Sequence, residues 1–165
     1  MTRLILMRHA KAAAADGMQD HGRPLTARGL RDAARAGGVI TREGWRPTRA
    51  LVSDAVRTRQ TLEAMAGALD PVPPLVLDPD LYAAPLAVIL ARVAATPASI
   101  GCLLVIGHNP GIGEAALRLA TSGPATDIAR LGQGFPTATL AVLSLPGGWA
   151  AAEVGGRLDA LVLAG

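Results

Sequence analysis

The sequence predicts an α/β fold, a three-layer α/β/α sandwich around a mostly parallel central sheet. Uninterrupted apolar runs at residues 4–7 and 102–106 are typical of strands that are buried on both faces. Each run leads directly into a histidine, in Arg8-His9 and in Gly107-His108. Because parallel sheets bind ligands beyond the carboxyl ends of their strands, we expect both histidines to lie in one site at one edge of the sheet.

Length and composition favour a single domain over residues 1–165. Half of the chain is hydrophobic, which suffices for a substantial core. The only cysteine, Cys102, lies in an apolar run and is interpreted as a buried packing residue. No apolar stretch reaches the roughly 18 residues that a bilayer-spanning helix needs, and the chain enters a charged motif after one strand. We therefore expect a cytoplasmic protein without membrane contact.

Positive charge is concentrated in the first part of the chain. Residues 1–60 carry a net charge of +7 and residues 61–165 carry −4, within a total of +3. Such a bias can indicate nucleic-acid binding. Here the arginines are spread through a predicted loop and helix, which favours a solvated helix face and a small anion site. We expect no nucleic-acid partner.

The first strand is expected at residues 3–7, and a polar loop follows it to about residue 24. Apolar and small residues then recur at helical spacing, which predicts an amphipathic helix that begins at Thr26. Gly44 and Pro47 are expected to end this helix. Its predicted inward face consists of Leu30, Ala33, Ala34 and Gly37.

A second strand is expected at residues 50–52. Ser53 or Asp54 can cap the helix that follows, which places Arg57 in its first turn. The proline-rich segment 70–80 predicts a rigid connection around a short strand at residues 75–77. The predicted inward face of the second helix consists of Ala55, Thr58, Leu62, Met65, Ala66 and Leu69.

The second half of the chain repeats the alternation of strand and helix. A helix is predicted around residues 86–93, a strand ends at Ile106, and a further helix begins at Pro110. The late apolar runs 138–145 and 149–154 are separated by Pro146-Gly147-Gly148, which predicts a hairpin at the sheet edge. The predicted inward residues of the two helices are Leu86, Ile89, Leu90 and Val93, then Ile112, Ala115, Ala116 and Leu119.

Three features predict a phosphate site. They are Arg8 beside His9, Arg57 at a helix start, and the loop at residues 107–111 before another helix. Unpaired N–H groups at a helix start favour an anion, and an arginine fork suits phosphate oxygens. The glycine patterns of dinucleotide-binding and P-loop folds are absent, which argues against a nucleotide fold.

Several motifs, in this order, resemble those of one family. They are Arg8-His9-Ala10-Lys11, the segments at residues 20–29 and 53–61, and Gly107-His108-Asn109-Pro110-Gly111, with further likeness at 81–85 and 135–138. Together they resemble the histidine phosphatase superfamily, and within it the SixA-type branch of phosphohistidine phosphatases. The resemblance extends over nearly the whole chain.

The resemblance implies a phosphoglycerate-mutase-like fold and a metal-independent phosphatase with no cofactor. The implied reaction is hydrolysis of phosphohistidine in a protein substrate, such as a phosphohistidine-carrying signalling domain, through a covalent phosphohistidine intermediate. His9 is then the nucleophile, Arg8, Arg57 and His108 form the phosphate pocket, and Arg23 is a further basic position. The alternatives are a small-molecule phosphomonoesterase of the same superfamily and a non-catalytic phosphate-binding module, against which the intact set of residues argues.

The chemistry of these residue types agrees with the implied roles. A neutral imidazole nitrogen of His9 can attack phosphorus in line if the other ring nitrogen is held as N–H. We expect the nearby arginines to disfavour protonation of His9 and to stabilise the phosphoryl oxygens during transfer.

The departures from the family pattern concern the leaving group. Ala10 stands where many members have glycine, and Tyr82 stands near the expected position of a glutamate general acid. An alkoxide leaving group needs such an acid more than an imidazole does, which favours phosphohistidine as substrate. Asp16 and Asp20, in the loop after His9, are the candidate general acids that remain, but the favoured interpretation is that both are solvated loop carboxylates.

Three further residues receive structural interpretations. His21 lies in a polar loop and is therefore expected to face solvent. Its spacing to the other histidines is not that of a metal site. Thr61 lies one turn after Arg57, where packing or a backbone hydrogen bond is expected. Lys11 is either a solvated lysine or a residue that guides an acidic substrate.

Overall fold

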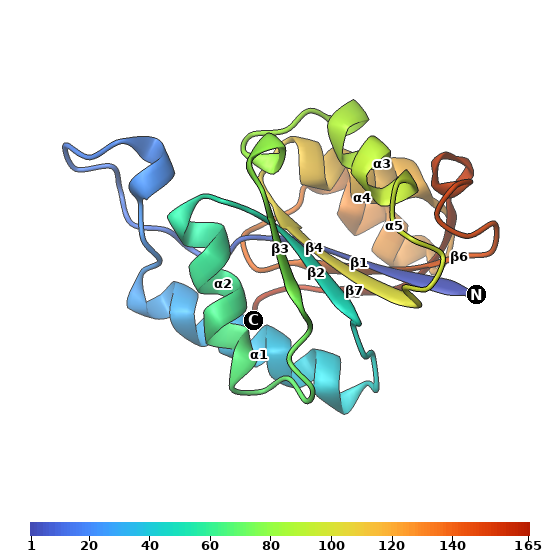
Figure 1. Cartoon of the computed structure of the whole chain (residues 1–165), viewed down its shortest axis with the longest axis horizontal. Helices are drawn as coiled ribbons and strands as arrows, with labels where there is room; N and C mark the ends of the chain where they lie inside the picture. The colour runs from blue at the N-terminus through green and yellow to red at the C-terminus, as the bar shows by residue number, and fades with distance from the viewer.

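The computed structural model describes all 165 residues and contains one seven-stranded sheet in the order β3-β2-β4-β1-β6-β7-β5. In Figure 1, helices α1 and α2 cover one face of the sheet, while α3, α4 and α5 cover the other. This arrangement confirms the predicted α/β/α sandwich. The strands are β1 Thr2–Arg8, β2 Arg49–Ser53, β3 Leu75–Asp78, β4 Cys102–Gly107, β5 Ala120–Ser122, β6 Leu140–Leu145 and β7 Gly156–Val162. The helices are α1 Ala27–Arg42, α2 Val56–Ala66, α3 Leu86–Ala94, α4 Gly111–Leu119 and α5 Ala125–Gln133.

The sheet is mostly parallel, as predicted, because only β6 runs against its neighbours. Strand β4 pairs in parallel with both β1 and β2, and β2 pairs in parallel with β3. Strand β6 is antiparallel to β1 and to β7. The register places Arg8 of β1 opposite Gly107 of β4, so the residues that follow these two strands leave the sheet at the same level.

Two layers of core form on the two faces of the sheet. Along β1, Leu4 and Leu6 point into the layer beneath α3, α4 and α5, while Ile5 and Met7 point into the layer beneath α1 and α2. All six residues of β4 are buried. The continuous apolar runs thus form central strands covered on both faces, as the sequence predicts.

The inward face of α1 differs from the predicted one. Thr26 caps the helix as expected, accepting a hydrogen bond from the Gly29 N–H. Leu30 is 45% exposed and Ala34 is also exposed, so these two predictions are wrong. The buried face includes Gly29 instead, where the helix comes so close to the Lys11 backbone that a Cβ would lie 2.2 Å from its carbonyl oxygen. The buried residues of α1 are Gly29, Asp32, Ala33, Ala36, Gly37 and Ile40.

Helix α2 begins at Val56 and places Arg57 in its first turn, as predicted. Its cap is Ala55, without a side-chain hydrogen bond, so the assignment of the cap to Ser53 or Asp54 is wrong. Those two side chains bind histidines instead, and both bonds belong to the site described below. The predicted face of α2 is buried apart from the half-buried Ala66.

The predicted final hairpin is only partly correct. Strand β6 is present, but residues 149–154 form a turn and a short 3₁₀ helix, and the antiparallel partner of β6 is β7. Of the run at 149–154, Trp149 and Ala152 are buried in the core, and Trp149 donates a hydrogen bond to the Ile100 carbonyl at 2.7 Å. The pair is also not at the edge, because β5 lies outside β7. Strand β5, helix α5 and strand β7 are additional to the predicted elements.

The remaining predicted strands and helices are present. Strand β3, at the sheet edge, has exposed side chains, and α3 and α4 bury Ile89 and Ile112 as predicted. Cys102 is buried, and burial raises its pKa to about 11. None of the helices combines the length and the apolar character needed to cross a membrane.

Candidate active site

The two histidines meet at the carboxyl edge of the sheet, as the strand pattern predicts. His9 follows β1 and His108 follows β4, and their ring centroids are 5.2 Å apart. The exposed fractions are only 6% for His9 and 4% for His108. The backbone N–H of His9 donates to the Gly107 carbonyl at 3.1 Å, which fixes one histidine to the strand of the other.

The hydrogen bonds of His9 define which of its nitrogens is free to react. Nδ1 lies 2.8 Å from the Ala10 carbonyl oxygen, so Nδ1 carries the hydrogen and Nε2 carries the lone pair. Arg57 Nε donates to this Nε2 at 3.3 Å, which agrees with that tautomer. Burial, together with the charges of Arg57 and Arg8, lowers the pKa of His9 to about 4. His9 is therefore neutral at neutral pH, with Nε2 directed at a guanidinium.

Arg57 is 5% exposed and is held by the first turn of α2. The hydroxyl of Thr61 donates to the Arg57 carbonyl at 2.7 Å and accepts from the Ala10 N–H at 3.1 Å. Thr61 thus fixes the backbone of α2 to the residue after His9, which confirms its interpretation as a backbone hydrogen-bonding residue. The distance between Arg57 and His9 is set by this bridge.

His108 is held by the last residue of β2. Its Nε2 lies 2.7 Å from the Ser53 hydroxyl, while Nδ1 is buried and has no partner. Burial, followed by the proximity of His9 and Arg57, lowers the pKa of His108 to about 3. The ring is therefore neutral, and one of its nitrogens has no hydrogen bond within the protein.

Arg8, at the end of β1, faces the loop before β6. Its Nη1 donates to the Phe135 carbonyl at 3.2 Å, and its Nε is buried without a partner. Asn109 donates to the same carbonyl at 2.8 Å. Burial and the charge of Arg57 lower the pKa of Arg8. The Phe135 carbonyl thus positions two side chains that adjoin the histidines.

Asp20 is exposed, as its interpretation as a solvated carboxylate predicts, but it also belongs to the site. Arg57 donates to the Asp20 carbonyl at 2.8 Å through Nη1 and to its carboxylate at 3.0 Å through Nη2. Arg23 donates to the same carboxylate at 2.9 Å, and the Tyr82 hydroxyl donates to it as well. These bonds, the one from Tyr82 foremost, hold the pKa of Asp20 far below its usual range. Arg23 thus reaches the site through Asp20.

Tyr82 adjoins both His108 and Arg57. Its ring stands edge-on to His108, with centroids 5.4 Å apart, and the Arg57 guanidinium lies 5.8 Å from the ring centroid. The bond to Asp20 raises the pKa of the hydroxyl. Asp20 and Tyr82 are 62 positions apart, so no local pattern pairs them. The only available signal was that both lie in segments that carry the family resemblance.

Comparisons with known proteins agree with the motifs. The family model of the Histidine phosphatase superfamily (branch 1) matches residues 4–82. The structure named "Putative Phosphohistidine Phosphatase SixA", from Nakamurella multipartitia, is 33% identical to this chain with a TM-score of 0.84, over 99% of this chain and 96% of that one. A SixA structure from Agrobacterium tumefaciens, with the same designation, is 31% identical with a TM-score of 0.82, over 98% of each chain. The protein Rv1276c of Mycobacterium tuberculosis is 39% identical over 90% of this chain and 93% of its own.

This chain belongs to the histidine phosphatase superfamily. It resembles the two SixA structures over nearly their whole length, which identifies it as a phosphatase of the SixA-type branch. A phosphoglycerate mutase from Plasmodium falciparum, 18% identical with a TM-score of 0.58, shares the fold alone. The phosphoglycerate-mutase-like fold expected from the motifs is thereby confirmed.

Three loop residues of this histidine phosphatase have different surroundings. His21 is half-exposed, but its Nε2 lies 2.9 Å from the Asp54 carboxylate and its ring packs edge-on against Tyr82, so it does not simply face solvent. Asp16 and Lys11 are exposed, as expected. No three His, Cys, Asp or Glu side chains are grouped as ligands of a metal ion.

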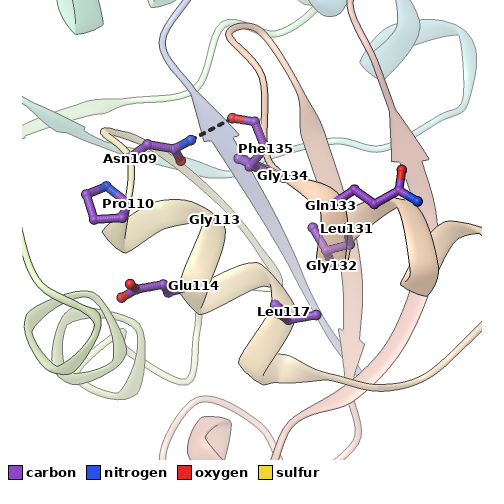
Figure 2. Close-up of a pocket in the computed structure, with 10 residues that line it drawn as sticks. All are labelled: Asn109, Pro110, Gly113, Glu114, Leu117, Leu131, Gly132, Gln133, Gly134 and Phe135. Carbon is purple, nitrogen blue, oxygen red and sulfur yellow. Dashed lines mark hydrogen bonds between the residues drawn. The ribbon is translucent and has the colours of Figure 1, made fainter.

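A groove borders the phosphatase site. It has a volume of about 240 Å³ and lies between α4 and the end of α5, as Figure 2 shows. Asn109 and Phe135 line it, and the hydrogen bond between them is drawn in the same view. Arg8, His9, Arg57 and His108 are not among its lining residues. The groove is therefore adjacent to the site and contacts it through the Phe135 segment.

Proposed function

We propose that this histidine phosphatase hydrolyses phosphohistidine in a protein substrate, such as a phosphohistidine-carrying signalling domain, through a phosphohistidine formed on His9. The observation that carries the proposal is the state of His9. Its Nδ1 is bonded to the Ala10 carbonyl, so the unprotonated Nε2 faces Arg57. A buried neutral imidazole with a fixed tautomer has the properties of a nucleophile for phosphoryl transfer.

The proposed reaction has two displacement steps. In the first, His9 Nε2 attacks phosphorus, and the bond from phosphorus to the substrate nitrogen breaks as the new nitrogen–phosphorus bond forms. In the second, water attacks the phosphohistidine, inorganic phosphate leaves, and His9 is regenerated. Arg8 and Arg57 stabilise the charge on the phosphoryl oxygens in both steps.

His108 and Arg23 complete the proposed site. The Ser53 hydroxyl can donate to Nε2 of the neutral His108 ring, which leaves the hydrogen on Nδ1. A buried ring nitrogen without a partner is a polar group that a bound phosphoryl oxygen would satisfy. Arg23, which donates to the Asp20 carboxylate, contributes a further positive charge to the site.

The choice of phosphohistidine rests on the absence of a suitable proton donor. Asp20 is ionised by its three donors, and the Tyr82 hydroxyl is committed to Asp20. An alkoxide would leave poorly from such a site, whereas the leaving imidazole can carry a proton on its own ring. The similarity to SixA phosphohistidine phosphatases supports the same substrate class.

One observation favours a small-molecule phosphomonoesterase as the second candidate. The Asp20 carboxyl group lies beside Arg57 in the site, and an alkyl phosphate needs such a group to protonate its leaving oxygen. The low pKa of Asp20 in the free protein weighs against proton donation. We therefore keep this activity as the alternative.

The test combines a substrate panel with a search for the intermediate. Wild-type protein, His9→Ala and the control His21→Ala are given a phosphohistidine-carrying protein, phosphoramidate and a sugar phosphate. We expect the phosphohistidine protein to give the highest kcat/KM, and mass spectrometry to find an acid-labile phosphoryl adduct on His9 in the wild type and in His21→Ala. Turnover by His9→Ala, an acid-stable adduct on serine, or comparable rates for the sugar phosphate would contradict the proposal.

A further inference from the structure

Both terminal nitrogens of Arg57 are occupied by a single residue. Nη1 donates to the backbone carbonyl of Asp20 at 2.8 Å, and Nη2 donates to the carboxylate of Asp20 at 3.0 Å. The third donor, Nε, points at His9 Nε2. Each terminal nitrogen therefore already donates one of its two N–H groups to Asp20, and a carbonyl oxygen and a carboxylate oxygen together hold the two-pronged position that an oxyanion would take on Nη1 and Nη2.

Arg57 is not free to leave this position. Its residue is 5% exposed, its carbonyl is held by Thr61, and its Nε contacts the proposed nucleophile. An oxyanion that binds Nη1 and Nη2 in the same two-pronged way must therefore replace Asp20 there.

Asp20, in contrast, lies in an exposed segment. Its side chain is 53% exposed, and all residues from 14 to 20 are exposed. The short 3₁₀ helix Asp20–Gly22 has no buried residue, and Figure 1 shows this segment extending beyond the sandwich. The His21–Asp54 hydrogen bond ties this segment to the turn before α2. Since Arg23 belongs to the same segment, only Arg57 and Tyr82 bind the Asp20 carboxylate from elsewhere in the site.

We infer that Asp20 is an internal competitor for the phosphoryl group: it occupies the place of the phosphoryl oxygens on Arg57 in the free protein, and binding of a phosphoryl group displaces it. Asp20 is thus a residue that determines the affinity of the site. The inference rests on the proposed function only in that Arg57 is the phosphoryl ligand. It adds a role that neither the motif nor the reaction assigns to Asp20.

The direction of the effect follows from mass action. The apparent dissociation constant of an oxyanion equals its intrinsic value divided by the fraction of protein in which Arg57 is free. Asp20→Asn keeps the shape but removes the charge, which weakens the bonds to Arg57 and raises that fraction. It also removes a negative charge beside the bound anion. Both changes tighten binding.

The experiment is calorimetric titration of the full-length protein with inorganic phosphate and, separately, with tungstate. If Asp20 holds Arg57 in about nine-tenths of the free molecules, Asp20→Asn lowers the dissociation constant of each anion about 10-fold. Tyr82→Phe, which removes one of the bonds that hold Asp20 in place, shifts it in the same direction by less. The matched control is Asp16→Asn, which removes the same charge from the same loop at an exposed residue with no hydrogen bond to the site, and leaves the constant unchanged.

Arg57→Ala separates failure of this inference from failure of the proposed function. Loss of anion binding in Arg57→Ala, with unchanged or weaker binding in Asp20→Asn, overturns the inference and leaves the phosphate site intact. Undiminished binding in Arg57→Ala overturns both, because the anion is then bound elsewhere. Unchanged anion affinity in Asp20→Asn, with a loss of turnover confined to alkyl phosphates, overturns the inference in favour of a proton-donating role.

Discussion

Ser53 Oγ lies 2.7 Å from His108 Nε2, so the last residue of β2 fixes the histidine that follows β4. Ser53 is completely buried, and its hydroxyl has no other side-chain partner. The two strands pair in parallel and end at the same edge of the sheet. The orientation of His108 is therefore set by the sheet and not by a mobile loop.

Ser53→Ala should cost both stability and activity. The substitution leaves the buried Nε2 of His108 without a partner, which costs about 1–3 kcal/mol of unfolding free energy. Urea denaturation measures this loss, and we expect kcat to fall with it. Ser122→Ala, at an exposed serine of β5, is the control. A Ser53→Ala protein with unchanged stability and kcat would show that the bond does not hold the ring.

Arg57→Ala should abolish most of the turnover. Removing a preorganised donor to the transferring group costs roughly 2.7–4 kcal/mol in the barrier, so kcat should fall about 100-fold or more. Arg57→Lys should also be impaired, because one ammonium group cannot replace a fork that reaches both His9 and the phosphoryl group. The exposed Arg59, two residues on, supplies the control Arg59→Ala. Equal losses in the two alanine variants would refute a specific role for Arg57.

Stability should fall as the pH decreases below the ordinary pKa of histidine. Burial lowers the pKa of His9 to about 4 and that of His108 to about 3, from 6.5. Both side chains therefore bind protons more weakly in the folded protein than in the unfolded chain. Their contribution is complete above about pH 6.5 and is lost progressively between about pH 6.5 and the folded-state values.

Urea denaturation at about pH 7.5 and about pH 5 measures this dependence. His9→Gln should reduce it, since a group that titrates only in the unfolded chain has been removed. His21→Gln, at a half-exposed histidine, is the comparison. The same pH dependence in wild type and His9→Gln would mean that His9 is not held neutral by the fold.

Rates should depend steeply on the leaving group. Since no protonated carboxyl faces the site, phosphoimidazole-type and activated aryl phosphates should be hydrolysed well and alkyl phosphates poorly. The measurement is kcat/KM along a series of aryl and alkyl phosphates of increasing leaving-group basicity. A flat dependence would reveal a proton donor and favour the phosphomonoesterase alternative.

The convergence of the candidate site residues could be predicted because it depends on strand ends. Apolar runs that end in histidine define two parallel strands, and the register of β1 with β4 then brings His9 and His108 together. Arg57 joins them because a helix begins directly after a third parallel strand. These are local patterns combined with one rule of sheet architecture.

The surroundings of Asp20 could not be predicted in the same way. Its partners Arg57 and Tyr82 are 37 and 62 positions away, and an exposed loop residue gives no periodic signal. The prediction of the buried face of α1 was wrong for a related reason. Hydrophobic spacing favours Leu30, whereas the observed packing depends on how closely a helix approaches a neighbouring backbone.

Gly29 has no reactive side chain, but its close approach to Lys11 bears on the position of the His9 ring. The start of α1 packs directly against the main chain of Lys11, two residues after His9, with no side chain between them. A methyl group at position 29 would push that main chain and carry the Ala10 carbonyl, the anchor of the His9 ring, out of place. A variant with a larger residue at position 29 would therefore lose activity much as a variant of His9, the proposed nucleophile, does, although every reacting group is still present.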